Sequence, residues 1–154
     1  MIFDTHAHYY DEAFDADRAA LLASLPGRGV ALVVCPGCDL ESSRQSIALA
    51  ERYGFLYAAA GYHPENLEGA ALSDLDAVKA LCAHPKVVAV GEIGLDPLGD
   101  DPQFERQQWL LDEQLKLAKR YDLPVILHSR RTHDKLAMHL KRHDLSRTGV
   151  VHGF

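Results

Sequence analysis

The sequence has few cysteines, no long apolar run and no excess of positive charge. Three cysteines, an odd number, do not make a disulfide framework and are typical of a reducing compartment. No run of about 18 apolar residues is present, so we predict no membrane span. Residues 1–6 lack a basic region and a cleavage site, so we expect no signal peptide and a cytoplasmic protein.

The formal net charge of −6 provides no overall basic surface for nucleic acid. This weighs against tight binding of a DNA duplex, but it leaves room for an enzyme whose metal ions, rather than lysines, meet the phosphate. The hydrophobic share of 47% and the charged share of 25% are those of a soluble globular protein, and 154 residues suit one domain.

Cys35 and Cys38 form a C-x-x-C pattern, which is compatible with redox or metal chemistry. A second cysteine pair that would complete a tetrahedral zinc site is absent from the sequence. We therefore interpret the pair as part of a strand-to-helix loop that happens to carry two cysteines.

Apolar strands alternate with helix-length segments along the whole chain. Strands are predicted near residues 2–6, 30–35, 55–60, 86–91, 124–128 and 149–152. Helices are predicted near residues 15–25, 40–53, 73–84, 103–121 and 132–143. Buried strands rich in Val, Ile and Ala that alternate with helices indicate βαβ units, and so an α/β domain with a parallel sheet over residues 1–154.

Two helix starts can be predicted in detail. Ser73 is expected to cap the helix that follows it, with acidic residues in its first turn. Asp101 followed by Pro102 predicts a cap and then proline at the first helical position.

Potential metal ligands follow the predicted strands. His6 and His8 follow the first strand, Glu92 the fourth, His128 the fifth and His152 the sixth. Imidazole nitrogens and carboxylate oxygens are the ligands of a hydrolytic zinc, manganese or magnesium site. The ends of strands are also where a barrel or a parallel sheet presents its chemistry.

The spacing of these residues predicts a site for two divalent ions. Residues two apart on a strand point to the same face, so His6 and His8 can hold one ion. Glu92 lies between glycines that let the backbone turn beside a ligand, and its two oxygens can bridge to a second ion held by His128 and His152. Two ions about 3.5–4 Å apart activate water and stabilise both oxygens in phosphoryl transfer.

Three further residues are candidates for binding substrate. His63 closes the third strand, and we expect it to contact substrate or to donate to a ligand. Asp96 either orients a ligand or a water, or caps a turn. Arg130 or Arg131 can grip a phosphate bidentately, or be a solvated cation at a helix start. The other histidines are interpreted as solvated, structural residues of helices: His84, His133, His139 and His143.

In these motifs the chain resembles the TatD family of metal-dependent deoxyribonucleases, in the amidohydrolase superfamily. The resemblance rests on five motifs: Asp4-Thr-His-Ala-His8, Gly61-Tyr-His-Pro64, Gly91-Glu-Ile-Gly-Leu-Asp96, Leu127-His-Ser-Arg130 and Val151-His-Gly-Phe154. It implies a TIM-type (β/α)8 barrel, of which about six strands and five helices are present. It also implies 3′-to-5′ hydrolysis of DNA with two Mg, Mn or Zn ions. By resemblance, His6, His8 and Glu92 hold one ion, and Glu92, His128 and His152 hold the other.

The chain departs from the family pattern in two places. Pro97 stands where the family has an aromatic or other apolar residue, which changes the loop over the site. The sequence also stops after the sixth predicted strand, before the family's late Glu-Thr-Asp-Ala-Pro segment, whose aspartate completes the first metal site. Such a chain is expected to expose the edges of its first and sixth strands, and so to associate with itself, to close imperfectly or to depend on a missing partner segment.

Alanine is frequent in residues 1–96, whereas residues 97–154 contain only Ala118 and Ala137. We hypothesise a seam near residues 91–97, at which two related sequences were joined; local fluctuation of composition is the alternative. The hypothesis predicts that the two parts match different relatives when each is compared separately.

Three functions remain in competition after the sequence alone. The leading one is a metal-dependent phosphodiesterase that acts on DNA. The second is a metallohydrolase of another ester, such as that of D-aminoacyl-tRNA; no lysine stands at a strand end to become the carboxylated bridge that many such enzymes use, and Glu92 takes that place. The third is a truncated or chimeric fragment that binds metal and self-associates with little activity.

Overall fold

The computed structural model describes residues 1–153. Phe154, the last residue of the final motif, therefore lies outside the described residues. The strands are β1 (Ile2–Asp4), β2 (Val30–Pro36), β3 (Leu56–Ala60), β4 (Val87–Leu95), β5 (Val125–Ser129) and β6 (Val150–Val151). The helices are α1 (Arg18–Ser24), α2 (Leu40–Arg52), α3 (Leu72–Leu81), α4 (Phe104–Arg120) and α5 (His133–His143), with short 3-10 helices η1 (Glu12–Phe14), η2 (Pro26–Arg28) and η3 (Pro64–Gly69).

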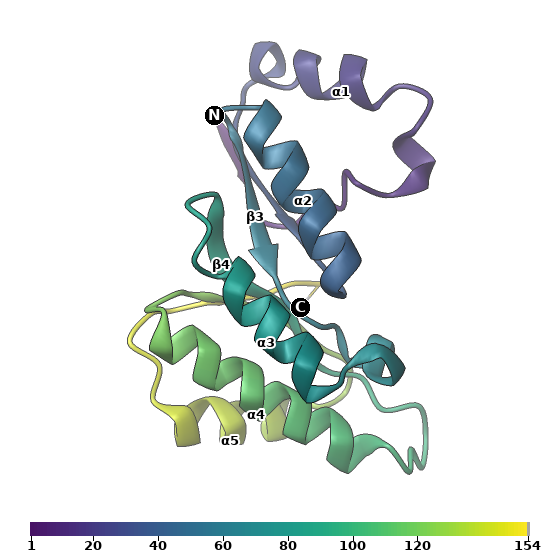
Figure 1. Ribbon diagram of the computed structural model, residues 1–154, viewed down its shortest axis with the longest axis vertical. Helices are drawn as coiled ribbons and strands as arrows, with labels where there is room; N and C mark the ends of the chain where they lie inside the picture. Colours follow the sequence, from purple (N-terminus) through teal and green to yellow (C-terminus); the bar gives the residue numbers. More distant parts are fainter. Residues whose placement is uncertain (154) are drawn as a thin grey trace.

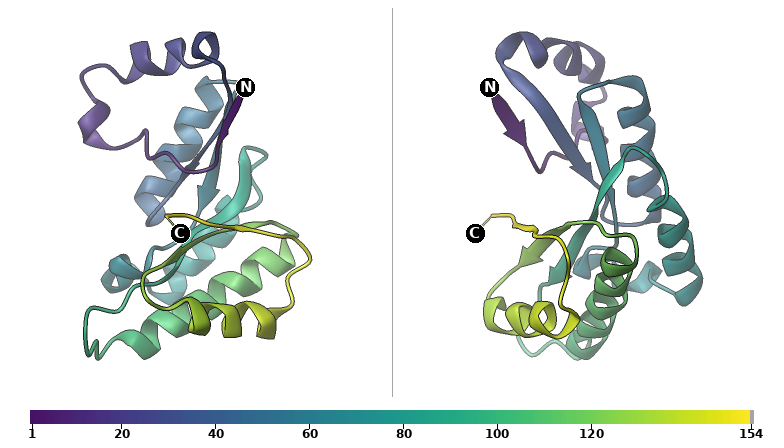
Figure 2. Two further views of the ribbon diagram at one scale, coloured as in Figure 1. Left: turned by 180° about the vertical axis from the view of Figure 1, so that it is seen from behind. Right: turned by 90° about the vertical axis from the view of Figure 1, so that its left-hand side faces the viewer.

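The six strands are all parallel and pair in the order in which they occur in the sequence. The sheet curls into half of a barrel, with β1 and β6 at its two ends (Figure 2). Helices α2, α3 and α4 follow one another across its outer side (Figure 1). The predicted barrel-type α/β fold of six strands and five helices is therefore confirmed for residues 1–153.

The alternation of side chains along each strand divides the core into two parts. On β2, Val33 and Cys35 pack with the outer helices, whereas Val34 points to the opposite, inner face. The inner cluster is small and consists of Val34, Ala59, Ala89 and Ile126. Most of the buried apolar surface therefore lies between the sheet and its helices.

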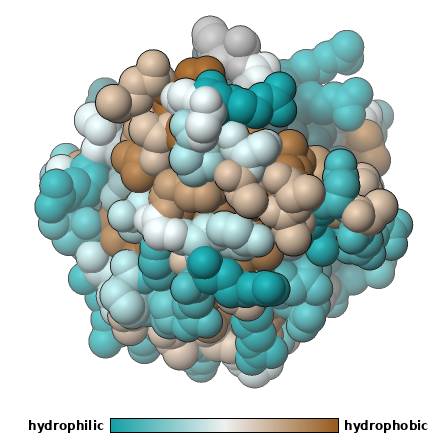
Figure 3. Space-filling view, turned by 90° about the horizontal axis from the view of Figure 1, so that it is seen from above, coloured by the Kyte–Doolittle hydropathy of each residue, from teal (hydrophilic) through white to brown (hydrophobic). Residues whose placement is uncertain are grey.

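The inner face is open at the two ends of the sheet. Phe3 pairs in register with Leu32, and Val150 pairs with Ile126, so both lie on the inner face. Phe3 is 58% exposed and Val150 is 38% exposed. In the view from above, hydrophobic residues reach the surface near the middle of the molecule, with hydrophilic residues around them (Figure 3).

Two buried glutamines of α4 hold the loops that follow β3 and β4. Gln114 accepts from the backbone N–H of Tyr62 at 2.6 Å and donates to its carbonyl at 3.1 Å. Gln107, two turns earlier on the same face, makes the matching pair with Asp96 at 2.8 and 3.0 Å. The primary amide can donate and accept at once, so each glutamine fixes a loop that leads into the strand-end site.

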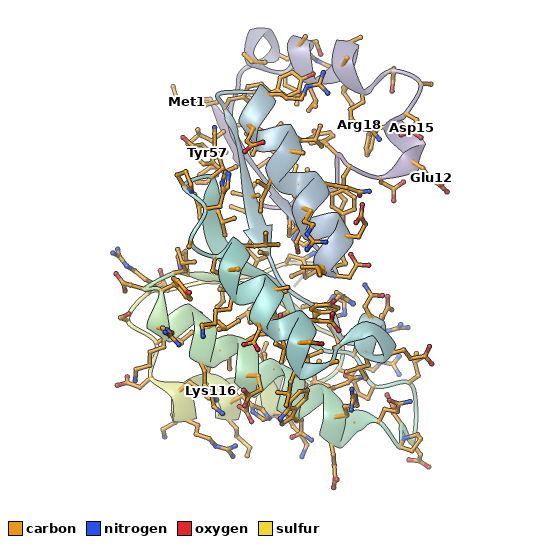
Figure 4. The ribbon with its side chains drawn as sticks, viewed as in Figure 1. Met1, Glu12, Asp15, Arg18, Tyr57 and Lys116 are labelled. Atoms are coloured by element: carbon orange, nitrogen blue, oxygen red, sulfur yellow. The ribbon has the colours of Figure 1, made fainter. Side chains whose placement is uncertain are left out.

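Arg18 fixes the loop that follows β1. Its guanidinium donates to the carbonyls of Tyr9, Tyr10 and Asp11, at 2.7, 3.2 and 2.7 Å. It also bonds Asp15 at 2.6 Å, and the two side chains lie together beside α1 (Figure 4). Residues 9–11 come directly after His8, so this clamp limits the movement of the segment that carries the first two histidines.

Several predicted boundaries were wrong. Helix α3 begins at Leu72 with Ala71 as its cap, so Ser73 lies inside the first turn; Asp74 instead accepts from the Ala71 N–H at 3.0 Å. Helix α4 begins at Phe104, because Asp101 accepts from the N–H of Gln103 at 2.7 Å and forms a turn before the helix. Strand β4 continues to Leu95, four residues beyond the prediction, and β1 ends at Asp4.

The interpretation of His139 as a solvated residue was also wrong. His139 is 5% exposed, because α5 packs against α4 and turns this side chain toward Asp112. Its Nδ1 lies 2.8 Å from Asp112 Oδ1, and His143 Nε2 lies 2.6 Å from the same oxygen. His84, by contrast, lies on the surface 3.0 Å from Glu51. No helix of the described residues is long and apolar enough to cross a membrane.

Candidate metal centre

The predicted ligands come together at the carboxyl ends of four strands. Glu92 and His128 are on β4 and β5, His152 follows β6 directly, and His6 and His8 follow β1. Backbone contacts hold the last three in place. The Ala7 N–H, between the two histidines, donates to Val34 O at 3.2 Å, and the His152 N–H donates to Leu127 O at 3.0 Å.

The first group consists of His6, His8 and Glu92. The two Nε2 atoms lie 2.9 Å apart, and they lie 3.3 and 3.6 Å from Glu92 Oε2. Two imidazole nitrogens at this distance repel each other if both present lone pairs, unless a proton or a cation lies between them. Their geometry therefore fits a divalent ion, and these residues can hold one.

The second group gathers around the other oxygen of Glu92. His152 Nε2 lies 2.6 Å from Oε1, and His128 Nδ1 lies 3.3 Å from Oε1 and 3.3 Å from His152 Nε2. The rings of His6 and His152 stack with centroids 3.8 Å apart. The two groups are therefore adjacent and share a single carboxylate, which is the arrangement predicted for a bridging ligand.

His63 also approaches this oxygen, with Nε2 at 3.7 Å from Glu92 Oε1, and His63, Glu92 and His128 form a further possible ligand group. However, His63 Nδ1 accepts from the Glu65 N–H at 3.1 Å. A neutral imidazole that accepts at Nδ1 carries its proton on Nε2. The nitrogen that faces the centre is therefore a donor, which suits contact with Glu92 or substrate better than metal ligation.

The electrostatics of the centre favour an anionic Glu92 with neutral imidazoles at His8, His63 and His152. Burial alone would raise the pKa of Glu92, but hydrogen bonds from His128 and His6 hold it far below its usual value. Burial lowers the pKa of His8, His63 and His152, so their rings are neutral at pH 7. Neutral imidazole and ionised carboxylate are the forms that bind metal.

The hydrogen bond to Glu92 raises the pKa of His128 against the effect of burial, and a bond to Asp96 adds to the rise. His128 Nε2 lies 2.8 Å from Asp96 Oδ2, on the side of the ring that faces away from Glu92. A carboxylate in this position fixes the tautomer and the ring orientation of a ligating histidine. Asp96, predicted as a substrate-binding residue, therefore has a direct contact with a predicted ligand.

Tyr10 has the corresponding position beside His8. Its hydroxyl lies 2.8 Å from His8 Nδ1 and donates to Cys38 Sγ at 3.5 Å. The hydroxyl therefore accepts from His8, which leaves Nε2 with its lone pair toward Glu92. His6 differs, because its Nδ1 is buried without a partner among the described residues.

The sequence interpretation missed Tyr10 and assigned Cys38 to a strand-to-helix loop, and Cys38 lines the hollow at the centre. The two-residue spacing from His8 to Tyr10 repeats the spacing that drew attention to the two histidines, and it was the available signal. Burial raises the pKa of the Cys38 thiol to about 11, so it remains protonated at neutral pH. Cys35 is buried in the core, which agrees with a structural interpretation of the pair.

Arg130 and Arg131 are exposed and come directly after β5, the strand that carries His128. The Arg130 N–H donates to Leu95 O at 3.1 Å, and next to this contact, at Gly94, β4 approaches β5 closely. A Cβ built on Gly94 would lie 1.8 Å from the carbonyl oxygen of His128, and the φ of +154° also favours glycine. A hollow of about 370 Å³ lies above the centre, and its lining residues are His8, Cys38, His63, Glu65, Asn66, Glu92, His128 and His152.

The family model described as "TatD related DNase" matches residues 3–154. The chain belongs to the TatD family. It is 63% identical to the metal-dependent hydrolase YjjV of Escherichia coli, over 98% of this chain and 59% of YjjV. It is 35% identical to the metal-dependent hydrolase YabD of Bacillus subtilis, over 100% of the chain and 61% of YabD. A 3′-5′ ssDNA/RNA exonuclease TatD of Cronobacter turicensis is 34% identical, over 86% of the chain and 50% of the relative.

Solved structures support the same assignment. The crystal structure of E. coli YjjV matches with a TM-score of 0.93 and 60% identity, over 99% of this chain and 60% of that chain. A guanine deaminase from C. acetobutylicum matches with a TM-score of 0.53 and 16% identity, over 95% of this chain and 43% of the deaminase, which shows likeness of fold alone. The chain thus spans about three fifths of the length of YjjV. YjjV matches on both sides of residues 91–97, and the seam there stays a prediction.

Proposed function

We propose that the protein is a metal-dependent hydrolase that cleaves phosphodiester bonds in DNA, as a TatD-like 3′-to-5′ exonuclease. The observation that carries the proposal is the position of Glu92, whose two oxygens face two separate sets of imidazoles. The names of the matched TatD relatives as ssDNA/RNA exonucleases support a nucleic-acid substrate.

Two divalent ions, Mg, Mn or Zn, are proposed as the cofactors. His6, His8 and Glu92 would hold one, and Glu92, His128 and His152 would hold the other, in agreement with the distances in the two groups. When bound, such ions activate water and stabilise charge on a phosphoryl group.

The residues of the chain have separate proposed tasks. Glu92 is the catalytic carboxylate, because it is ionised, buried and shared by both groups. His63 donates through Nε2 to a substrate oxygen, since its other nitrogen is occupied by the Glu65 N–H. Asp96 acts through His128. Arg130 is exposed directly after β5, the strand that carries His128, and is proposed to meet a phosphate of the DNA strand.

A second candidate substrate is another ester, such as that of D-aminoacyl-tRNA. The same centre could polarise a carboxylic ester, because it contains no element that is specific for phosphorus. A DNA substrate is preferred because relatives named as 3′-5′ ssDNA/RNA exonucleases match most of this chain, one of them over 86% of its length.

The decisive experiment is digestion of a single-stranded DNA labelled at its 5′ end, with and without added Mg²⁺, Mn²⁺ or Zn²⁺. The proposal predicts metal-dependent shortening from the 3′ end, and its loss in His128→Ala. Equal digestion by His128→Ala, or digestion in excess chelator, would contradict it. An aminoacyl ester cleaved in place of DNA would support the second candidate.

Self-association is proposed as a property of the same chain. Phe3 and Val150 are exposed on the inner face, and β1 and β6 each have one unpaired edge in the sheet. Sedimentation of the chain at increasing concentration should reveal a dimer or larger species. A Phe3→Glu variant should shift the population toward monomer, and an unchanged distribution would contradict an interface at this face.

A further inference from the structure

A groove beside the metal centre lies between the loop after β3 and the loop after β4. Its volume is about 680 Å³, within the range of about 300–1,000 Å³ that is usual for small-molecule sites. We call it the acid-lined groove and define it by Tyr62, Glu65, Glu68, Asp96, Leu98 and Asp101. It is distinct from the hollow above the ligands, but Glu65 lines both.

The side chains of the acid-lined groove offer hydrogen-bond acceptors and few hydrogen-bond donors. Its carboxylates include the exposed Glu65 and Glu68, and none of the residues that line it is a lysine or an arginine. The amide of Gln107, at its floor, is already occupied by Asp96 O and Asp101 Oδ2, at 3.0 and 3.1 Å. A phosphate would meet like charge here, whereas a group with N–H donors would find partners.

A second observation points to a ligand in the same place. Asp96 lines the groove and is 4% exposed, and its Oδ1 is buried without a hydrogen-bond partner among the described residues. Its other oxygen bonds His128 at 2.8 Å. A buried carboxylate oxygen without a partner costs free energy that a donor from a ligand would recover. One side chain therefore connects the groove to the metal centre.

We propose that the acid-lined groove binds the nucleobase of the nucleotide whose phosphodiester lies at the metal centre. This inference rests on the proposed function. The base is uncharged, carries N–H donors and is flat enough to lie against Tyr62 and Leu98, which give the groove its apolar wall. Arg130 and Arg131 are exposed after β5, the strand next to β4, and in this proposal they would meet the phosphates on either side of the scissile bond.

Binding can be measured without hydrolysis, by following backbone amide signals of the full chain in two-dimensional NMR. The probes are deoxyadenosine, 2-deoxyribose 5-phosphate and alanine amide, each titrated separately. We expect saturable shifts at residues 62–68 and 96–103 with deoxyadenosine and none there with the sugar phosphate. Shifts with the sugar phosphate alone, or with none of the probes, would overturn the proposal. Shifts with alanine amide alone would overturn it in favour of an aminoacyl ammonium group.

Two exposed leucines provide a matched pair of variants. Leu98 is 71% exposed and lines the groove, and Leu72 is 66% exposed at the start of α3, outside the groove. Leu98→Ala should raise the Kd for deoxyadenosine by about three- to tenfold, from loss of part of one apolar contact. Leu72→Ala should leave it unchanged. Equal effects of both substitutions, or none from Leu98→Ala, would contradict the assignment of the groove.

The outcomes of this experiment and of the DNA digestion are independent. A chain that digests DNA but fails to bind deoxyadenosine in the groove would refute only the base-binding assignment. If the chain binds deoxyadenosine there but leaves DNA intact, only the proposed activity is refuted. In a digesting chain, Leu98→Ala should raise KM for DNA with little change in kcat, because Leu98 does not touch the ligands.

Discussion

The molecule contains two clusters of histidines and carboxylates, one at the strand ends and one between α4 and α5. In the helical cluster, Asp112 Oδ1 lies 2.8 Å from His139 Nδ1 and 2.6 Å from His143 Nε2, so each ring has a carboxylate partner. At the strand ends, the single carboxylate of Glu92 is shared by His6, His128 and other rings.

The difference between the clusters lies in where the lone pairs point. In the strand-end cluster, the Nε2 atoms of His6 and His8 lie 2.9 Å apart. Their lone pairs repel each other at this distance, and a cation between them would relieve the repulsion. In the helical cluster, hydrogen bonds with Asp112 satisfy the rings, and Gln108 lies 3.2 Å from the other nitrogen of His139. Residue type alone is therefore a poor guide to a metal site. A better guide is that the lone pairs of several nitrogen and oxygen atoms converge on one point. Among residues 1–153, the possible metal-binding groups are found only at the strand ends.

The largest expected effect is that of Glu92→Gln. The substitution keeps the size of the side chain but removes the charge that both groups share, so affinity for divalent ions should fall by more than about 100-fold. Isothermal titration of the metal-free chain measures this. Asp112→Asn is the matched control and should bind metal as the wild type does. Equal losses of metal affinity in both variants would show that the two clusters do not differ in metal binding.

Asp96→Asn should have the next largest effect. It removes the anionic partner of His128 while keeping an oxygen in place, so the affinity of the second ion should fall by about 10- to 100-fold. The d–d spectrum of the Co²⁺-loaded chain should show the change, with the first ion retained. Simultaneous loss of both ions would mean that Asp96 acts on the whole centre rather than through His128.

Tyr10→Phe should have a smaller effect on the other side of the centre. The hydroxyl is a neutral partner of His8, so its removal should weaken the first ion by about tenfold or less, without changing the melting temperature of the metal-free chain by more than a few degrees. Tyr9→Phe is the control, because the Tyr9 ring packs against Phe14 rather than a ligand. An unchanged metal affinity in Tyr10→Phe would show that the Tyr10 hydroxyl does not support binding of the first ion.

The helical cluster should affect stability and not metal binding. Burial would raise the pKa of Asp112, but hydrogen bonds from His139 and His143 lower it below its ordinary 3.8. A depressed pKa means that the stabilisation is present above 3.8 and is lost as the pH falls through the lower folded value. Urea unfolding of Asp112→Asn should show about 1.5–3 kcal/mol less stability at pH 7. The difference in unfolding free energy between wild type and Asp112→Asn should narrow as the pH falls below 3.8, and a difference that stays constant there would contradict the assignment.

The sequence predicted the strands well because buried parallel strands are short runs of Val, Ile and Ala bounded by breaks in the pattern. It also predicted the main ligands, since a histidine or glutamate that directly follows such a strand has its position set by local geometry. The contacts of Asp96 with His128 and of Tyr10 with His8 depend on how loops from different strands meet. His139 was misplaced for the same reason, because its burial depends on the packing of α4 against α5.

Electron paramagnetic resonance of the full chain with Mn²⁺ distinguishes a Glu92 carboxylate that bridges two ions from one that binds a single ion. At two equivalents of Mn²⁺, we expect two bound ions per chain and the spectrum of a spin-coupled pair, which Glu92→Gln abolishes. A single bound ion, or two ions whose spectra remain those of isolated Mn²⁺, would contradict the claim that one carboxylate bridges both groups.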